Sequence, residues 1–257
     1  MTDKNIIFGL HAVEALLEKN PERIRRAYLL EQVGKADRGD HGKLQKIMQV
    51  FRIHGIACDM LSRDALDRLT HKGNHQGVAV ECAPAKAHSE SDLHELLDEL
   101  QGPPLLLILD GVQDPHNLGA CLRSADAAGV HAVIAPRDKS VGLTPTVVKV
   151  ACGAAEVVPF IQVTNLARTI DQIKERGIWL FGMADGAEKS IYEEKLDIPM
   201  AFVLGNEEKG LRHLTKEKCD FLLKIPMHGS VSSLNVSVAT GVCLFEAVRQ
   251  RSRLKRV

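Results

Sequence analysis

The 257-residue sequence predicts an α/β protein with a small N-terminal α/β domain and a larger C-terminal domain built on a mainly parallel sheet. Short apolar runs alternate with segments of helical periodicity, which is the rhythm of β-α-β units. The composition changes at residues 82–91, where small residues, a proline and charges interrupt the hydrophobic periodicity, and this indicates a domain boundary. The length suits one large domain or two modest ones, each able to bury a core.

The segment before this boundary is predicted to form a small sheet covered by helices. Strands are expected at 5–8, 24–30, 56–61 and 77–82, and helices at 10–19, 42–53 and 62–70. A charged, glycine-rich stretch at 34–42 interrupts this pattern. It is either a simple connector or a loop that faces RNA.

The segment after the boundary has a longer and more regular pattern, preceded by a helix near 92–101. Strands are expected at 104–110, 131–135, 156–160, 178–183, 200–205 and 221–226, with helices between most of them. Ligands of parallel sheets usually bind outside the carboxyl ends of the strands. The loops after residues 110, 204 and 225 are therefore the candidate positions for a site.

Composition narrows the classes of function. Basic and acidic residues balance at 33 each, which rules out a strongly basic nucleic-acid coat and gives no sign of a membrane-binding surface. The basic residues of 249–257 either contact phosphate or form a solvated tail. The N-terminus has no signal or transit pattern, and no apolar run approaches the roughly 18 residues of a membrane span. We therefore expect a cytoplasmic protein.

Several chemistries lack their usual motifs. The six cysteines occur singly, without the spacing of a zinc site, so they are expected to be reduced core residues and no metal site is predicted. No G-x-G-x-x-G follows a strand, and neither a P-loop, a G-x-S-x-G elbow nor an H-E-x-x-H motif occurs. Ordinary dehydrogenases, P-loop kinases, α/β-hydrolases and zincins are each disfavoured.

Two of the three candidate loops combine glycine with polar side chains. In the first, which begins at Leu109, Asn117 lies near a helix start and precedes Arg123 by between one and two helical turns. The second, Leu204-Gly-Asn-Glu-Glu-Lys-Gly210, turns through polar residues between two glycines. Each loop taken alone is equally consistent with a capped helix or a solvated turn.

The third loop mixes polar and apolar residues more closely. A buried strand ends at Ile225-Pro-Met227, small and hydroxyl or amide residues follow from Gly229, and a helix is expected from about Ser233. Side-chain donors and the free backbone N–H groups of the helix N-terminus would then face one small volume. This arrangement predicts a binding site, with a Ser- or Asn-capped helix as the simpler alternative.

In this order, the three loops resemble motifs 1, 2 and 3 of the SpoU branch of the SPOUT superfamily, whose members are RNA ribose 2′-O-methyltransferases. The matching residues are Asn117 with Arg123, then Leu204 to Gly210, then Ile225-Pro-Met-x-Gly with Ser233-Leu-Asn-Val-Ser237. Gly9-Leu-His-Ala-Val13 and His75-Gln-Gly77 resemble the substrate-binding domain of that branch, which is similar to ribosomal protein L30e.

Within the branch, the chain resembles the enzymes that methylate a guanosine ribose in bacterial 23S rRNA. The loop at 34–42 is longer than is usual there, and Asn206 stands where alanine is frequent. The resemblance implies an S-adenosylmethionine-dependent homodimer with a trefoil knot in its C-terminal domain, although periodicity alone indicates an unknotted doubly wound sheet. It also implies an RNA-binding domain at 1–82, a linker and helix at 83–103, and a methyltransferase domain at 104–257.

The resemblance also assigns the site residues. The cofactor-binding set is Leu204, Gly205, Asn206, Gly210, Ile225, Pro226, Met227, Ser233 and Leu234, and the catalytic set is Asn117, Arg123, Glu207, Ser233 and Asn235. A guanidinium is essentially always protonated, so Arg123 is expected to act as a phosphate or oxyanion clamp, and a base role would require an unusual shift. The alternatives are methylation of another structured RNA such as tRNA, a catalytically silent RNA-binding protein of the same fold, and a nucleotide-using α/β enzyme.

Overall fold

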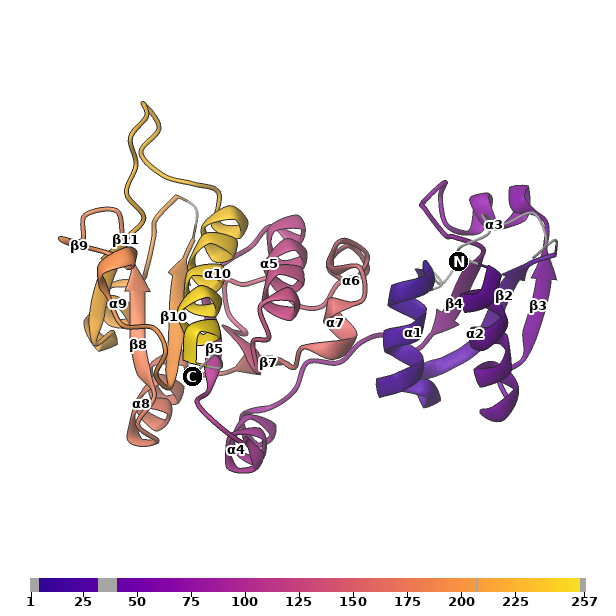
Figure 1. Cartoon of the computed structure of the whole chain (residues 1–257), viewed down its shortest axis with the longest axis horizontal. Helices are drawn as coiled ribbons and strands as arrows, with labels where there is room; N and C mark the ends of the chain where they lie inside the picture. Colours follow the sequence, from indigo (N-terminus) through magenta and orange to yellow (C-terminus); the bar gives the residue numbers. More distant parts are fainter. Residues whose placement is uncertain (1–4, 32–40, 207, 255–257) are drawn as a thin grey trace. The chain divides into compact units, whose positions relative to one another are not determined.

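The computed structural model describes residues 5–31, 41–206 and 208–254. The chain divides into two compact units, each with its own sheet (Figure 1). Unit 1 comprises Met1–Lys86 and Cys152–Val157, and unit 2 comprises Ala87–Ala151 and Val158–Val257. The predicted α/β class with a parallel C-terminal sheet is confirmed. Among the described residues, no helix is both long and apolar enough to span a bilayer.

Unit 1 contains a four-stranded sheet in the order β1-β4-β2-β3. Its strands are β1 (Ile6–Phe8), β2 (Ile24–Leu30), β3 (Cys58–Leu61) and β4 (Val78–Cys82). Its helices are α1 (Leu10–Lys19), η1 (Pro21–Arg23), α2 (His41–Ile53), α3 (Arg63–Leu69) and α7 (Ala154–Val157). Only β2 and β3, which α2 connects, run parallel, whereas β4 is antiparallel to both of its neighbours. The predicted β-α-β pattern is therefore present once in this sheet, as β2-α2-β3.

The two N-terminal sequence patterns meet at the start of α1. The Gln76 side chain accepts a hydrogen bond from the Leu10 backbone N–H at 3.2 Å. The buried His75 ring accepts one from the Gly77 N–H through Nδ1 at 2.9 Å, and its Nε2 lies 3.3 Å from Asp67 Oδ1. Because the first N–H groups of a helix have no partner within the helix, Gln76 satisfies one of them. This turn therefore has a structural role in unit 1.

Unit 2 contains a seven-stranded sheet in the order β7-β6-β5-β10-β8-β11-β9, in which every described pair is parallel. Its strands are β5 (Leu105–Asp110), β6 (Ala132–Pro136), β7 (Phe160–Val163), β8 (Trp179–Met183), β9 (Lys189–Ser190), β10 (Met200–Gly205) and β11 (Phe221–Lys224). Its helices are α4 (Glu90–Glu99), α5 (Pro115–Ala127), α6 (Pro145–Ala151), α8 (Leu166–Glu175), η3 (Ile191–Glu193), α9 (His213–Lys218) and α10 (Val236–Leu254).

Helices cover both faces of this sheet, and this explains its continuous apolar strands. Leu93 of α4 and Ile170 and Ile173 of α8 pack into one buried cluster with the sheet. On the other side α10 packs against α5 and β10, and Cys121 Sγ lies 3.4 Å from Thr240 Oγ1 (Figure 1). On one side of β5 the sheet continues with β6 and β7, and on the other with β10 and β8. Strands β5 and β10 therefore flank a topological switch point, where ligands of such sheets bind.

The structure corrects several details predicted from the sequence. The strand expected at 156–160 is wrong, because residues 154–157 form α7 and β7 begins at Phe160. Pro159 cannot donate a hydrogen bond to a strand ladder, so pairing begins after it. The last helix begins at Val236, because the Asn235 side chain accepts from the Ser237 N–H at 2.9 Å and caps it. Strand β9 was not predicted.

The cysteines were only partly predicted. All six are free, as expected, and Cys82, Cys121 and Cys243 are buried. Cys58 and Cys152 are exposed, so their assignment to the core is wrong. A single cysteine carries no sequence pattern that distinguishes a core position from a surface one, and this explains the error.

Candidate active site

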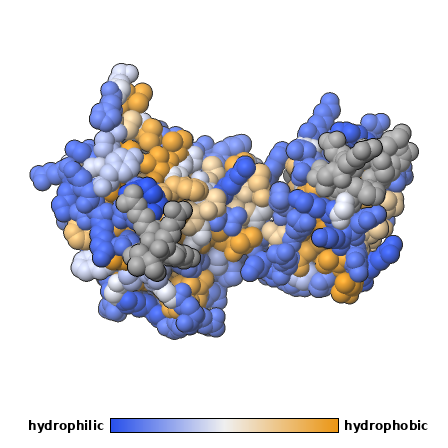
Figure 2. Space-filling view, viewed as in Figure 1, coloured by the Kyte–Doolittle hydropathy of each residue, from blue (hydrophilic) through white to orange (hydrophobic). Residues whose placement is uncertain are grey.

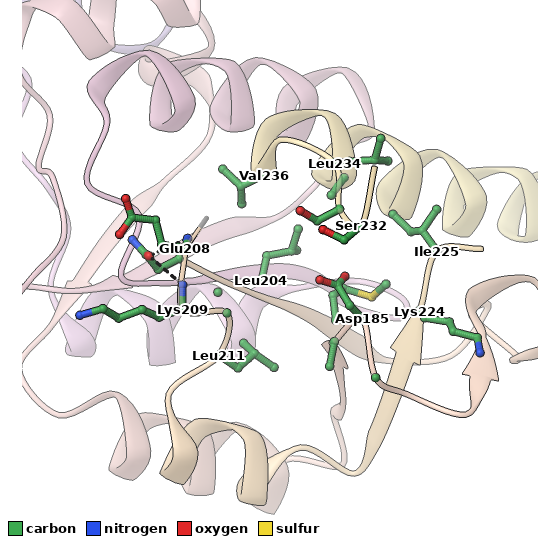
Figure 3. A pocket seen from close by; sticks show the side chains of 18 of the residues that line it. Asp185, Leu204, Glu208, Lys209, Leu211, Lys224, Ile225, Ser232, Leu234 and Val236 are labelled. Atoms are coloured by element: carbon green, nitrogen blue, oxygen red, sulfur yellow. Dashed lines mark hydrogen bonds between the residues drawn. The ribbon is translucent and has the colours of Figure 1, made fainter. Parts of the chain in front are cut away.

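A cavity of about 530 Å³ opens at the carboxyl ends of β8, β10 and β11, and we refer to it as the first cavity (Figure 3). Figure 3 shows Leu204, Ile225 and Leu234 around its centre, with Glu208 and Lys209 toward one side and Asp185 and Lys224 toward the other. The lining comes from residues 183–186, 204–206, 208–211, 216, 224, 225, 227, 232–234, 236 and 239.

The loop after β10 folds back on itself along this cavity. Asn206 and Gly210 form an antiparallel bridge through backbone hydrogen bonds of 3.1 and 2.8 Å. The Asn206 side-chain oxygen also accepts from the backbone N–H groups of Glu208 and Lys209, at 3.0 and 3.2 Å. A Cβ at Gly205 would lie 2.1 Å from the Gly210 carbonyl carbon, so no side chain fits at Gly205 while the loop keeps this conformation.

A second cavity of about 700 Å³ lies at the carboxyl ends of β5 and β10, on the other side of the same loop. It shares Asn206 and residues 208–211 with the first cavity, and the Asn206 side chain donates to the Gly111 carbonyl at 3.1 Å. Its remaining lining consists of Asp110, Gly111, Gln113, Asp114, Asn117, Lys139, Arg212 and His213.

One hydrogen bond joins the segments that border the two cavities. The Asn235 side-chain amide donates to the Asn117 side-chain oxygen at 3.0 Å. Asn117 lies in the first turn of α5 and lines the second cavity, whereas Asn235 directly follows Leu234, which lines the first. Two residues 118 positions apart are thus brought into contact at the boundary of the cavities.

The structure brings together most of the residues assigned by resemblance. Every member of the cofactor-binding set except Pro226 lines the first cavity. Of the catalytic set, Ser233 lines the first cavity and Asn117 the second, and Asn235 contacts Asn117. Arg123 is exposed on α5 and is not among the lining residues of either cavity. Glu207 lies outside the described residues.

Sequence analysis missed several charged residues of the two cavities. Asp185, Lys216 and Lys224 line the first cavity, and Asp110 and Arg212 line the second. Asp110 carried a usable signal, because it is a carboxylate at the carboxyl end of an otherwise apolar strand. No sequence pattern marked Arg212, because Asp110, the residue it contacts, lies 102 positions away in the chain.

The electrostatics around the site exclude a thiolate at Cys219. Burial, and then the nearby carboxylate of Asp220, raises the pKa of this thiol to about 12, so it stays neutral at physiological pH. Within the described part of the chain, no group of three or more histidine, cysteine, aspartate or glutamate residues is placed to hold a metal ion.

The fold and the cavities define an α/β protein whose parallel sheet carries two adjoining cavities at its switch point. The chain belongs to the SpoU rRNA methylase family, whose model matches residues 104–245. A second model, described as RNA 2′-O ribose methyltransferase substrate binding, matches residues 6–88. Family membership confirms the resemblance drawn from the three loops.

Curated relatives match over nearly their whole length. The chain is 54% identical to the 23S rRNA (guanosine-2′-O-)-methyltransferase RlmB of Pectobacterium atrosepticum, with 96% of this chain and 98% of that protein covered. It is 51% identical to the protein of the same name from Pseudomonas putida, with 98% of each chain covered.

Solved structures share the fold. A crystal structure of an RNA 2′-O ribose methyltransferase aligns with a TM-score of 0.74 and 28% identity, covering 96% of this chain and 88% of that one. The SpoU methyltransferase AviRb from Streptomyces viridochromogenes, solved with AdoMet, aligns with a TM-score of 0.74 and 23% identity, covering 96% and 90%.

Proposed function

We propose that this protein methylates the ribose 2′-hydroxyl of a guanosine in 23S rRNA, with S-adenosylmethionine as the methyl donor, in the cytoplasm. The observation that carries the proposal is the pair of cavities that share the 206–211 loop and are joined through Asn117 and Asn235. Methyl transfer requires the donor and the acceptor to meet at one point, and two cavities with a common boundary can hold them next to each other. The activity named for the curated relatives supports the choice of reaction and substrate.

The first cavity suits the cofactor. Its volume lies within the usual range for small-molecule sites, about 300–1,000 Å³. The apolar side chains of Leu204, Ile225 and Leu234 provide surface for an adenine ring, and the glycine at 205 lets the loop pack closely along the cavity. Lys224 and Asp185 offer opposite charges for the carboxylate and ammonium of an amino-acid moiety. When bound, S-adenosylmethionine supplies an electrophilic methyl group.

Residues at the boundary of the cavities would position the acceptor ribose. Holding two reactants in attack geometry contributes about 7–11 kcal/mol to a rate enhancement. Asn117, Ser233 and Asn235 orient the ribose in this proposal, and Glu207 retains its assignment by resemblance as a partner for a cation. A ribose hydroxyl is a weak acid, so negative charge builds on its oxygen as its proton passes to solvent. Arg123, which lines neither cavity, keeps its assignment by resemblance as a clamp on that charge or on an adjacent phosphate.

The proposal includes a homodimer formed through unit 2. Val238 and Phe245 are seven positions apart on α10, so they share one helix face, and each is about half exposed. Figure 2 shows apolar surface in the region of α10 and α5. An exposed apolar face of this kind suits a self-complementary interface. Light scattering at micromolar concentration should give the mass of a dimer, and a monomer mass would contradict this part of the proposal.

The proposal also includes the trefoil knot, the similarity of unit 1 to ribosomal protein L30e, and a division of labour in which unit 1 docks RNA. The path of the chain supports the knot, because residues 225–235 lead from β11 past the loop after β10 into α10. The match of residues 6–88 to a substrate-binding model supports the division of labour. A variant with residues 1–82 deleted should bind S-adenosylhomocysteine yet methylate rRNA poorly, and full activity would contradict the division.

The activity is tested with purified protein, radiolabelled S-adenosylmethionine and unmodified 23S rRNA transcript, followed by mapping of 2′-O-methyl marks. One methylated guanosine ribose is expected in 23S rRNA, and none in 16S rRNA or tRNA transcripts. Methylation of tRNA alone would establish the other structured-RNA substrate. Binding of rRNA without binding of S-adenosylhomocysteine would establish a silent RNA-binding protein. Binding of NAD or ATP in its place would point to a nucleotide-using enzyme.

A further inference from the structure

We infer that the second cavity receives the base of the target nucleotide, and that Arg212 reads guanine there through its O6 and N7 acceptors. The inference rests on the proposed function and assigns the part of the site that selects the nucleotide. It is carried by a buried carboxylate that fixes Arg212 in a cavity next to the Asn117 and Asn235 pair.

Arg212 is held by three contacts. Its backbone N–H donates to Asp110 Oδ2 at 3.0 Å, and its Nε lies 3.3 Å from Asp110 Oδ1. Its Nη2 donates to the Asp138 carbonyl at 3.2 Å. The Asp110 side chain is fully buried, and a buried carboxylate is costly unless a cation compensates it. The guanidinium therefore has a defined position before any ligand arrives.

A glycine lies beside the Arg212 guanidinium. Gly111 has a φ of +91°, a conformation that side chains rarely adopt, and a Cβ there would lie 3.5 Å from Arg212 Nη2. The Gly111 carbonyl in turn accepts from the Asn206 side chain at 3.1 Å. Arg212 thus lies against the loop that separates the two cavities.

Arg212 keeps donors for a ligand. Its contacts with the described residues use Nε and Nη2, and the Arg212 side chain remains 41% exposed. A guanidinium carries five N–H donors in a planar fork, so the two on Nη1 and the second one on Nη2 remain after these contacts, and Nη1 and Nη2 together form the two-pronged end of the fork. A fork of this kind matches the adjacent O6 and N7 acceptors of guanine, the commonest specific arginine contact with a base.

The charge of the second cavity favours a base over the phosphate backbone. A phosphate track needs an excess of cations. The charged lining residues balance instead, with Asp110, Asp114 and Glu208 against Lys139, Lys209 and Arg212. A cavity that offers donors and acceptors together suits the mixed hydrogen-bonding edges of a nucleobase.

The position of the cavity agrees with this assignment. Asn117 lines the second cavity and accepts from Asn235, which follows the lining residues of the first. A ribose held at this pair has the methyl donor on one side of the 206–211 loop and room for its own base on the other. The selectivity for guanosine then lies within unit 2.

The test couples a base analogue to a substitution. After the target position has been mapped, 23S rRNA is assembled by ligation with guanosine or 7-deazaguanosine at that position alone, because 7-deazaguanosine lacks the N7 acceptor. Single-turnover methylation by the wild-type protein should slow about 5- to 100-fold on the analogue. Arg212→Ala should be slower on normal RNA by a similar factor and show no further loss on the analogue. Arg212→Met keeps most of the side-chain length without any donor and should also have lost the discrimination.

Arg176→Ala is the matched control, because Arg176 is also paired with an aspartate, Asp98, at 2.6 Å but lies outside both cavities. It should keep the wild-type rate and the full analogue effect. Thermal unfolding and binding of S-adenosylhomocysteine establish that each variant is folded. If Arg212→Ala does not fold, the double variant Asp110→Asn with Arg212→Met decides the question, because it leaves no uncompensated buried carboxylate.

Two outcomes overturn the inference. One is wild-type methylation that is equally fast on both RNAs, and the other is an Arg212 variant that keeps the full analogue effect. Failure of the wild-type protein to methylate normal 23S rRNA is a different result, because it contradicts the proposed function and not the role of Arg212.

Discussion

The two cavities of unit 2 share one wall but are built by different means. The first depends on backbone shape, because Gly205 lies so close to Gly210 that no side chain fits between them. The second depends on an ion pair between a buried carboxylate, Asp110, and the partly exposed Arg212. The difference indicates that a single loop can serve two ligands when close backbone contact shapes one side and a positioned ion pair shapes the other. Substitutions should therefore affect the two sides separately.

The largest effect is expected at Arg123, which lines neither cavity. Arg123→Ala should lower the rate of methyl transfer by about 10²–10³, the cost of removing a group that stabilises charge in the transition state. S-adenosylmethionine affinity should change only a few-fold in isothermal titration. Partial rescue by Arg123→Lys would favour a clamp, whereas a loss of cofactor affinity equal to the loss of rate would move Arg123 into the first cavity.

Substitution of Gly205 should weaken ligand binding in the first cavity alone. Gly205→Ala places a methyl group 2.1 Å from the Gly210 carbonyl carbon and must displace the loop. Overpacking of this kind typically costs about 1–3 kcal/mol, so S-adenosylhomocysteine should bind about 5- to 100-fold more weakly. Gly42→Ala, in α2 with nothing within 4 Å of the new methyl, is the control and should leave the affinity unchanged. Equal affinities for all three proteins would show that the loop adapts freely.

Asn235 tests the boundary between the cavities, because its side chain both caps α10 and donates to Asn117. Asn235→Ala loses both functions, whereas Asn235→Ser keeps a capping hydroxyl but is too short to reach Asn117. The alanine variant should lose about 1 kcal/mol of unfolding free energy in urea titration, and the serine variant less. Both should methylate about tenfold more slowly, the scale of one lost hydrogen bond. If the methylation rates of the two variants fall only in proportion to their loss of stability, the hydrogen bond to Asn117 has no part in the mechanism.

The smallest effect on activity is expected from thiol modification, because no cysteine is among the lining residues of either cavity. Burial raises the pKa of Cys82 to about 11 and that of Cys219 to about 12, so both remain neutral and slow to react at pH 8. Iodoacetamide at that pH should label the exposed Cys152 first and then the exposed Cys58, because partial burial and the carboxylate of Asp59 raise the pKa of the Cys58 thiol. Peptide mass spectrometry measures the labelling, and activity should be retained. Early labelling of Cys219 would contradict its packing against the core of unit 2 and the raised pKa of its thiol.

Much of the fold of unit 2 was predictable from local patterns. Strands β5, β8 and β10 were predicted to within one residue, because buried parallel strands form continuous apolar runs bounded by polar loops. Helix α7 and the start of β7 were not, because the apolar run across 154–163 contains both and only Pro159 separates them. The short β9 pairs with β11 by two residues, too few for a periodic signal.

The sequence by itself determined the α/β class, the family and the three loops that carry polar residues, since each depends on residues close together along the chain. Only the tertiary structure decided which of those residues meet. The Asn117 to Asn235 hydrogen bond spans 118 positions and the Asp110 to Arg212 pair spans 102. Strand order places β10 beside β5, and this brings Asp110 and Arg212 into contact. Periodicity reports which face of an element is buried but not which element becomes its neighbour, so the second cavity emerged only from the folded chain.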